Sequence, residues 1–278
     1  MRKRQLQHIL KSHPATDGAG VKMNRIAMFD QPLTDPFLML DEFQSENESD
    51  YIAGFPSHPH RGMETLSYLL HGSLEHRDHL GHKGIIHSGG AQWMSAGRGI
   101  IHSEMPAREL DKLHGFQLWI NLPAAQKMKA PDYRDVEANE IPETQLETAK
   151  WRTIAGTWEI EGAQTVGPLQ NLAANTGILD VSLKPNSTLT INTKPQQRVL
   201  VKLYEGQLAT SPVAPEKSLL VFGEGDSLEL KTEGGAKLLV LSGTPIKEKI
   251  VHYGPFVMNS YDEIQQAIED YNAGRFGE

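Results

Sequence analysis

Two short stretches decide the fold of this chain: His58-Pro59-His60 and, further along, His102-Ser103-Glu104, which follows the glycine-framed run Gly97-Arg98-Gly99. In a β-strand, residues i and i+2 project to the same face, so each stretch places two potential metal ligands on one face. Nine of the twelve histidines lie between His58 and His114. This concentration indicates that the histidines of that segment share a function and are not scattered surface residues.

The sequence around these stretches predicts a turn-rich β structure. From Thr65 to Leu122, short apolar runs are separated by glycines, a spacing typical of a small antiparallel barrel or sandwich. Within 115–122, apolar residues alternate with Gln117, Trp119 and Asn121, which predicts a closing strand with one buried face.

A second β region follows a stretch of different character. Residues 123–150 contain three prolines and many charges without a period, which suggests a linker. The β pattern resumes from 179 to 241, and the turn at Gly72 is echoed by one at Gly206. We therefore expect an all-β fold of two jelly-roll-type antiparallel barrels, with domains at 1–135 and 136–278.

A short helix is expected to end the chain. Ser260 and Glu263 form a capping-box pattern, and Ile264, Ile268 and Tyr271 follow at helical intervals. The most economical interpretation is a structural helix that packs its apolar face on the barrels.

Composition excludes several classes of function. The net charge is −8, so direct nucleic-acid binding is not expected. The chain has no cysteine, which rules out disulfides and thiolate ligands. No apolar run approaches the length of a membrane span. We expect a cytoplasmic protein, or a nuclear one if the source is eukaryotic, and a monomer rather than an oligomer.

The paired ligands predict one divalent transition metal in the N-terminal domain. Three imidazoles and a carboxylate suit Fe(II), Mn(II), Ni(II), Co(II), Cu(II) or Zn(II), and we expect Fe(II) first. The spacing does not decide which glutamate supplies the carboxylate. Glu104 shares strand parity with His102, whereas Glu64 shares that of His58 and His60 and lies further along the strand.

The same segments resemble a known family. Residues 58–65 and 92–104 resemble the two signature segments of the pirins, which are double cupins, and residues 35–43 and 254–259 resemble the family's terminal segments. The resemblance implies that the metal is held by His58, His60, His102 and Glu104, which leaves Glu64 as a hydrogen-bond acceptor or a plain strand residue.

The second half of the chain does not repeat the ligands. When the two halves are aligned on their matching turns, His58 and His60 correspond to Asn192 and Lys194, and His102 and Glu104 fall near Lys237 and Leu239. The C-terminal domain is therefore expected to be free of metal, as the resemblance also implies.

The resemblance further implies an activity. Pirins resemble cupin quercetinases, so the expected function is a metal-dependent dioxygenase that cleaves a flavonol such as quercetin with O2 and releases CO. Glu104 would be both ligand and catalytic base. The alternative, also implied by the family, is a metal- and redox-sensing regulator without enzymatic activity that binds a transcription factor or a metabolic enzyme.

Other residues near the site carry weaker expectations. Arg61 and Arg98 could orient an oxygen-rich substrate or pair with structural carboxylates. Aromatic residues could wall a pocket or belong to the core, and the remaining histidines are expected in solvated turns. The aromatic residues are Phe43, Phe55 and Trp93, and the histidines are His71, His76, His79, His82 and His87.

Overall fold

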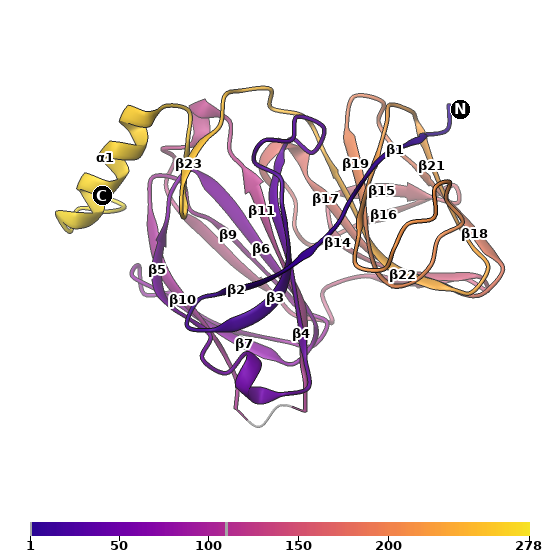
Figure 1. The fold of residues 1–278 in the computed structure, drawn as a ribbon, viewed down its shortest axis with the longest axis horizontal. Coiled ribbons are helices and arrows are strands. Elements are labelled where there is room, and N and C mark those ends of the chain that lie inside the picture. Colours follow the sequence, from indigo (N-terminus) through magenta and orange to yellow (C-terminus); the bar gives the residue numbers. More distant parts are fainter. Residues whose placement is uncertain (1, 109–110) are drawn as a thin grey trace. The chain divides into compact units, whose positions relative to one another are not determined.

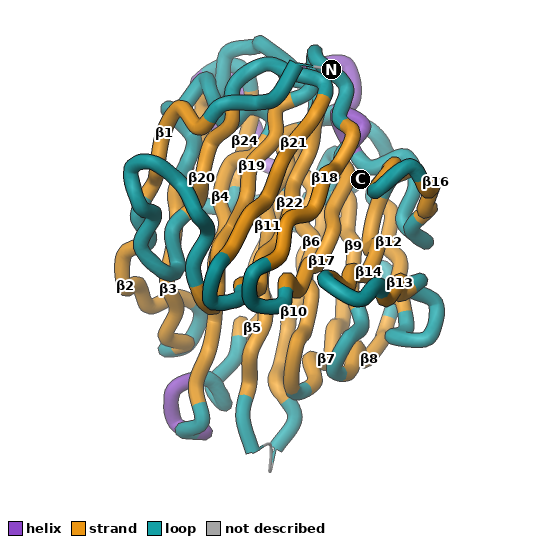
Figure 2. The backbone as a smooth tube through the Cα atoms, turned by 90° about the vertical axis from the view of Figure 1, so that its right-hand side faces the viewer, coloured by secondary structure: helices purple, strands orange, loops and turns teal. Residues whose placement is uncertain are grey.

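The computed structural model describes residues 2–108 and 111–278, and these residues fall into two compact units. Unit 1 contains residues 2–12, 32–35 and 139–245, and unit 2 contains residues 13–31, 36–138 and 246–278. Strands dominate both units (Figure 2). No helix in the described part of the chain is long and apolar enough to cross a membrane.

Unit 2 is built from two antiparallel sheets (Figure 1). The larger sheet has the order β12(Asp132–Val136), β9(Ala91–Ser95), β6(Met63–His71), β11(Leu113–Asn121), β4(Phe37–Ser45), β3(Val21–Ala27), β2(His13–Asp17). The smaller sheet has the order β5(Phe55–His60), β10(Ile100–Pro106), β7(Ser73–Asp78), β8(Lys83–His87). A hairpin of β23(Val251–Tyr253) and β24(Phe256–Met258) and the helix α1(Tyr261–Asn272) complete the unit.

Unit 1 has the same plan. Its larger sheet has the order β1(Leu6–Leu10), β20(Leu219–Phe222), β19(Arg198–Gly206), β22(Ala236–Gly243), β17(Gly177–Leu183), β14(Ala149–Ala155), β13(Glu143–Gln145). Its smaller sheet has the order β16(Ala163–Val166), β15(Thr157–Ile160), β18(Ser187–Asn192), β21(Ser227–Thr232).

The two units share their strand topology. The run β9-β6-β11-β4-β3 of unit 2 matches β20-β19-β22-β17-β14 of unit 1, so β18 takes the place in unit 1 that β5 takes in unit 2. This confirms the predicted all-β fold with a frame used twice. The helix is confirmed as well, because the hydroxyl of Ser260 accepts a hydrogen bond from the backbone N–H of Glu263.

The grouping by contacts differs from the predicted division at 1–135 and 136–278. Residues 2–12 and 32–35 fall in unit 1, where β1 pairs with β20. Residues 246–278 return to unit 2, where Phe256, Ile264 and Phe276 share one apolar cluster. The predicted linker, 123–150, is also partly strand: β12 pairs with β9 and buries Val136. Its charges hid this strand from the sequence analysis, because an edge strand exposes most of its side chains.

The interiors of the two units differ in polarity. Unit 1 has one continuous apolar core of aliphatic and aromatic residues. Unit 2 has smaller apolar clusters, and between its strands lie buried polar side chains that include His60, Glu64, His102 and Glu104. Buried polar groups are destabilising unless they are paired, so their concentration in unit 2 indicates a functional interior.

A buried lysine holds the turn after the first histidine pair. Lys127 is 2% exposed, and its Nζ donates to the carbonyl oxygens of Gly62 and Val257 and to Oδ1 of Asn121 at 2.7 to 2.9 Å. Burial lowers the pKa of Lys127 to about 7. Gly62 has φ +80°, and a Cβ there would meet the oxygen of Val257 at 2.0 Å, so only glycine fits.

We predict that Lys127→Met destabilises the protein by about 3 kcal/mol, because three buried oxygens lose their donor. The measurement is urea-induced unfolding, with tryptophan fluorescence as the signal. Lys83→Met is the matched control, since the side chain of Lys83 is 54% exposed and should change the stability by less than about 0.5 kcal/mol. Equal effects of the two substitutions would contradict this role of Lys127.

Candidate metal centre

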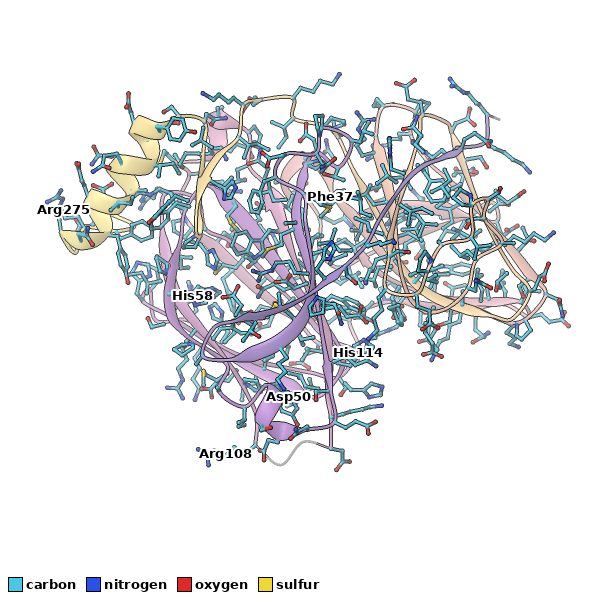
Figure 3. The ribbon with its side chains drawn as sticks, viewed as in Figure 1. Phe37, Asp50, His58, Arg108, His114 and Arg275 are labelled. Carbon is cyan, nitrogen blue, oxygen red and sulfur yellow. The ribbon has the colours of Figure 1, made fainter. Side chains whose placement is uncertain are left out.

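The candidate site is built where β5 pairs with β10. His58 and His102 are direct partners in this antiparallel register, and His60 is the partner of Ile100. Directly opposed residues project to the same face, so the side chains of His58 and His102 meet, and His60 joins them from two residues along. Figure 3 shows His58 inside the curve formed by the strands of unit 2.

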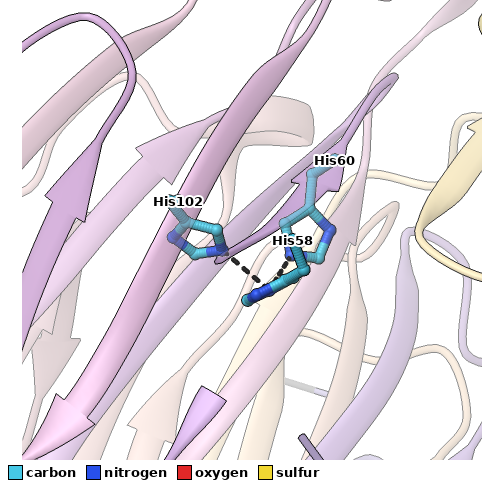
Figure 4. A group of neighbouring side chains, drawn as sticks. All are labelled: His58, His60 and His102. Atoms are coloured by element: carbon cyan, nitrogen blue, oxygen red, sulfur yellow. Dashed lines mark hydrogen bonds between the residues drawn. The ribbon is translucent and has the colours of Figure 1, made fainter. Parts of the chain in front are cut away.

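The three imidazoles converge through their Nε2 atoms (Figure 4). Nε2 of His58 lies 3.0 Å from Nε2 of His60 and 3.0 Å from Nε2 of His102. The side chains of His60 and His102 are buried, while His58 is half-buried. Within residues 2–108 and 111–278, this is the one group of at least three potential ligands whose ligand atoms all lie within 4.8 Å of one another.

The protonation of these rings suits metal ligation. Nδ1 of His58 lies 2.8 Å from the carbonyl oxygen of Pro56, which can only accept, so Nδ1 carries a hydrogen and leaves Nε2 as the ring atom available to a metal. Burial, followed by the neighbouring histidines, lowers the pKa of His60 and His102 well below 6.5. Neutral imidazole is the form that binds metals.

The spacing of the donors also fits one ion. Two nitrogens that bind the same metal at about 2.1 Å and at right angles lie about 3.0 Å apart. The two measured Nε2 separations, 3.0 Å each, have this value. These two separations match a first-row divalent cation with further coordination positions open.

Neither of the two candidate carboxylates belongs to the close group of ligand atoms that the three histidines form. Glu104 lies on the same face of β10 as His102, but a register shift separates them. Its oxygens accept hydrogen bonds from Ser67 Oγ at 3.0 Å and Gln117 Nε2 at 2.7 Å, and Glu104 is outside the close group of ligand atoms. Glu64 is fully buried and accepts from Trp93 and Lys129.

Sequence reasoning placed His76 in the wrong environment. His76 was expected in a solvated turn, but it lies within β7 and is fully buried. Its Nδ1 is 3.3 Å from Nδ1 of His102, its Nε2 is 3.6 Å from Oδ2 of Asp78, and its ring stacks on Tyr133 with centroids 4.4 Å apart. His82, at the surface, bonds to the same Oδ2 at 2.7 Å. The expectation of a solvated turn is thus wrong for His76, because alternation along β7 turns it inward with Leu74.

A cavity of about 580 Å³ adjoins the imidazoles and includes His58 and His60 in its lining. Phe29 stacks on His252 with centroids 4.0 Å apart and meets Trp119 edge to face at 6.2 Å. All three line the cavity, and so does Phe55. This volume and these flat walls suit a planar aromatic molecule.

The aromatic expectations from sequence are therefore met in part. Phe55 lines the cavity, whereas Phe43 belongs to an apolar core cluster. Trp93 donates to Glu64 instead. The sequence analysis missed the lining residues Phe29 and His252. They come from segments that lie far from the histidine stretches in the sequence, so no local pattern links them to the site.

The arginines divide between structural and pocket roles. Arg61 pairs with Asp270 of α1 at 2.9 Å and donates to the carbonyl oxygen of Arg98, which matches the structural alternative. Arg98 donates to the carbonyl of Gly277. Arg25, not anticipated from the sequence, lines the cavity and hydrogen-bonds Asp41 at 2.7 and 2.8 Å.

The fold and the three-imidazole cluster define a double-cupin protein with a candidate metal centre in one unit. The pirin family model matches residues 20–120, and the model of the pirin C-terminal cupin domain matches residues 178–277. The chain belongs to the pirin family.

Relatives and solved structures agree with this assignment. A Vibrio cholerae protein provisionally named quercetin 2,3-dioxygenase is 44% identical over 98% of both chains. Human pirin is 34% identical over 96% of this chain and 91% of its own length. The crystal structure of quercetin 2,3-dioxygenase from Acinetobacter baumannii has a TM-score of 0.89 and 31% identity, and it covers 99% of both chains.

We predict that His76→Phe weakens metal binding by about tenfold or more, because it keeps a ring against Tyr133 but removes the nitrogen beside His102. Titration of metal-free protein with Co(II) against a competing chelator measures the affinity. His87→Phe, at an exposed position of β8, is the control. An unchanged affinity in a folded His76→Phe variant would show that His76 does not support the ligand.

Proposed function

We propose that this chain is a metal-dependent dioxygenase that cleaves a flavonol such as quercetin with O2 and releases CO. The observation that carries the proposal is the aromatic-walled cavity that opens directly onto His58 and His60. A site for a non-enzymatic metal ion needs no cavity of about 580 Å³ beside the ligands. The substrate class is therefore a small planar aromatic.

Two comparisons support the same activity. The Vibrio cholerae relative carries the name of this dioxygenase provisionally, and the Acinetobacter baumannii structure carries it in its title. Both resemble this chain over nearly its whole length. The local geometry and the family resemblance thus point to one reaction.

We assign His58, His60 and His102 as metal ligands in unit 2 and Fe(II) as the first choice of metal, with Mn, Ni, Co, Cu and Zn as alternatives. When bound, the metal supplies a Lewis-acidic centre for a deprotonated substrate oxygen and for O2. A neutral imidazole adds no charge when it binds a metal, so the positive charge of the ion would remain to attract that oxygen.

Glu104 is proposed as the fourth ligand and as the base that takes the substrate's proton. Gln117 lines the cavity and donates to Oε2 of Glu104 at 2.7 Å, so one side chain joins the cavity to the carboxylate. For Glu104 to act as a base it must give up this bond and turn toward the substrate. Ser67, which donates to Oε1, would keep the other oxygen in place during that turn.

The cavity walls have distinct tasks in orienting the substrate. Phe29, Trp119 and His252 would hold the ring system flat between them. Asp17 and Arg25 also line the cavity and form an ion pair. Because Asp41 also binds Arg25, this rim is not cationic, and it suits neutral phenolic hydroxyls better than a carboxylate.

The test is elemental analysis of purified protein, followed by an aerobic assay of iron-loaded protein with quercetin. We expect one metal per chain, loss of flavonol absorbance and release of CO. His58→Ala should lose both metal and turnover. Glu104→Gln should lower kcat by about 100-fold or more and shift the pH profile, since it keeps the shape but removes the base.

One outcome would contradict the enzymatic proposal, and another would contradict the role given to Glu104. One metal per chain without turnover of quercetin or related flavonols would favour the alternative, a metal- or redox-sensing regulator of a transcription factor or metabolic enzyme. Full activity in Glu104→Gln would remove Glu104 from the mechanism while leaving the histidine ligands in place.

A further inference from the structure

Unit 1 has a second cavity, of about 650 Å³, at the place that corresponds to the cavity of unit 2. In unit 2, the lining includes the cross-strand pair Met39 and Trp119 of β4 and β11. In unit 1, it includes Gly177 and its partner Ser242 of β17 and β22, the matching strands.

The strand that carries the histidines in unit 2 also has its counterpart here. β5 lines the cavity of unit 2 through His58 and His60, and β18, which takes its place in unit 1, lines the second cavity through Asn192. The second unit has thus kept a cavity in the same part of the fold while its side chains offer different chemistry.

That chemistry is neutral hydrogen bonding. Of the fourteen lining residues, six carry amides and three carry hydroxyls. The two charged residues, Glu159 and Lys194, have opposite signs. An amide offers both donors and acceptors, which complements a hydroxyl group that does the same. The amides are Gln164, Gln170, Asn171, Asn175, Asn192 and Gln197.

Several contacts hold the cavity wall in place. Asn192 and Glu159 are cross-strand partners, and Nδ2 of Asn192 donates to Oε1 of Glu159 at 2.6 Å. This is the one side-chain bond of Asn192 among the described residues, so its oxygen can face a ligand. Arg4, 5% exposed, donates to Oγ1 of Thr193 and to the carbonyl of Lys194, both at 2.7 Å. A wall fixed before binding lowers the entropy lost on binding.

Trp158 also borders the cavity, and its indole N–H is already used by the carbonyl of Ala155 at 2.9 Å. Because Trp158 belongs to the apolar core and is 5% exposed, it offers the cavity only a small part of its surface. Amides and hydroxyls therefore dominate the lining, and they match a ring with many hydroxyls.

We propose that this cavity binds a neutral polyhydroxylated ligand, namely a sugar or a related polyol. The volume lies within the range of small-molecule sites and accommodates a ligand of one or two rings. The absence of a net charge in the lining separates this class from phosphorylated or carboxylated sugars. The site is independent of the metal centre and of the function proposed for it.

The experiment is saturation-transfer difference NMR and titration calorimetry on the full-length protein. The neutral probes are D-glucose, D-galactose, D-xylose and sucrose, and the charged probes are D-glucuronate and D-glucosamine. We expect saturable binding of at least one neutral probe, weakened roughly tenfold by Asn192→Ala and by Gln197→Ala, since each removes hydrogen bonds to the ligand.

Two controls separate this site from the rest of the protein. Gln207→Ala changes an exposed amide of unit 1 outside the cavity, and His58→Ala changes the metal centre; both should leave the sugar affinity unchanged. The proposal is overturned if no neutral probe binds saturably, if binding is the same in the cavity variants, or if a charged probe binds more tightly than every neutral one.

Discussion

The pairing of β5 with β10 is the interaction on which the metal centre depends. It places His58 directly opposite His102 and brings three Nε2 atoms together. A slip of one residue in this register would turn the histidines of one strand to the opposite face and disperse the donors. The site therefore requires a fixed register more than any particular loop.

Several tight contacts hold that register at the end of β5. The N–H of Gly62 donates to the carbonyl of Gly97 at 2.8 Å, which ties the turn after β5 to the turn before β10. A Cβ at Gly97 would meet the oxygen of Lys129 at 2.2 Å. In the same turn, Arg61 bonds to Asp270 of α1, and the carbonyl of Gly62 accepts a hydrogen bond from Lys127. The glycines near the histidines are thus explained by close backbone approach.

The sequence predicted the histidine cluster because strand alternation is a local property. The i, i+2 spacing alone places His58 and His60 on one face. The position of Glu104 could not be derived in this way, since a register shift intervenes between it and His102. His252 could not be assigned either, because a segment that crosses from the far end of the sequence has no local signal.

Two other residues show what the sequence analysis could and could not derive. Trp119 was placed on the less buried face of β11, and this face lines the cavity that adjoins the imidazoles. His76 could have been found from its alternation with Leu74, but nearby turn residues favoured the solvated interpretation. Alternation identifies a face correctly, yet it does not say whether solvent, core or a cavity covers that face.

The two units show how one topology supports different chemistry. Matching strands line both cavities, and the side chains on them decide what each can bind.

The central claim is that one metal ion is held by three imidazoles in unit 2, and anomalous diffraction from crystals of the iron-loaded protein tests it most directly. The account predicts a single strong peak about 2.1 Å from Nε2 of His58, His60 and His102, and the same map shows whether Glu104 turns to join them. No peak at this position, or a peak bound by other residues, would contradict the account.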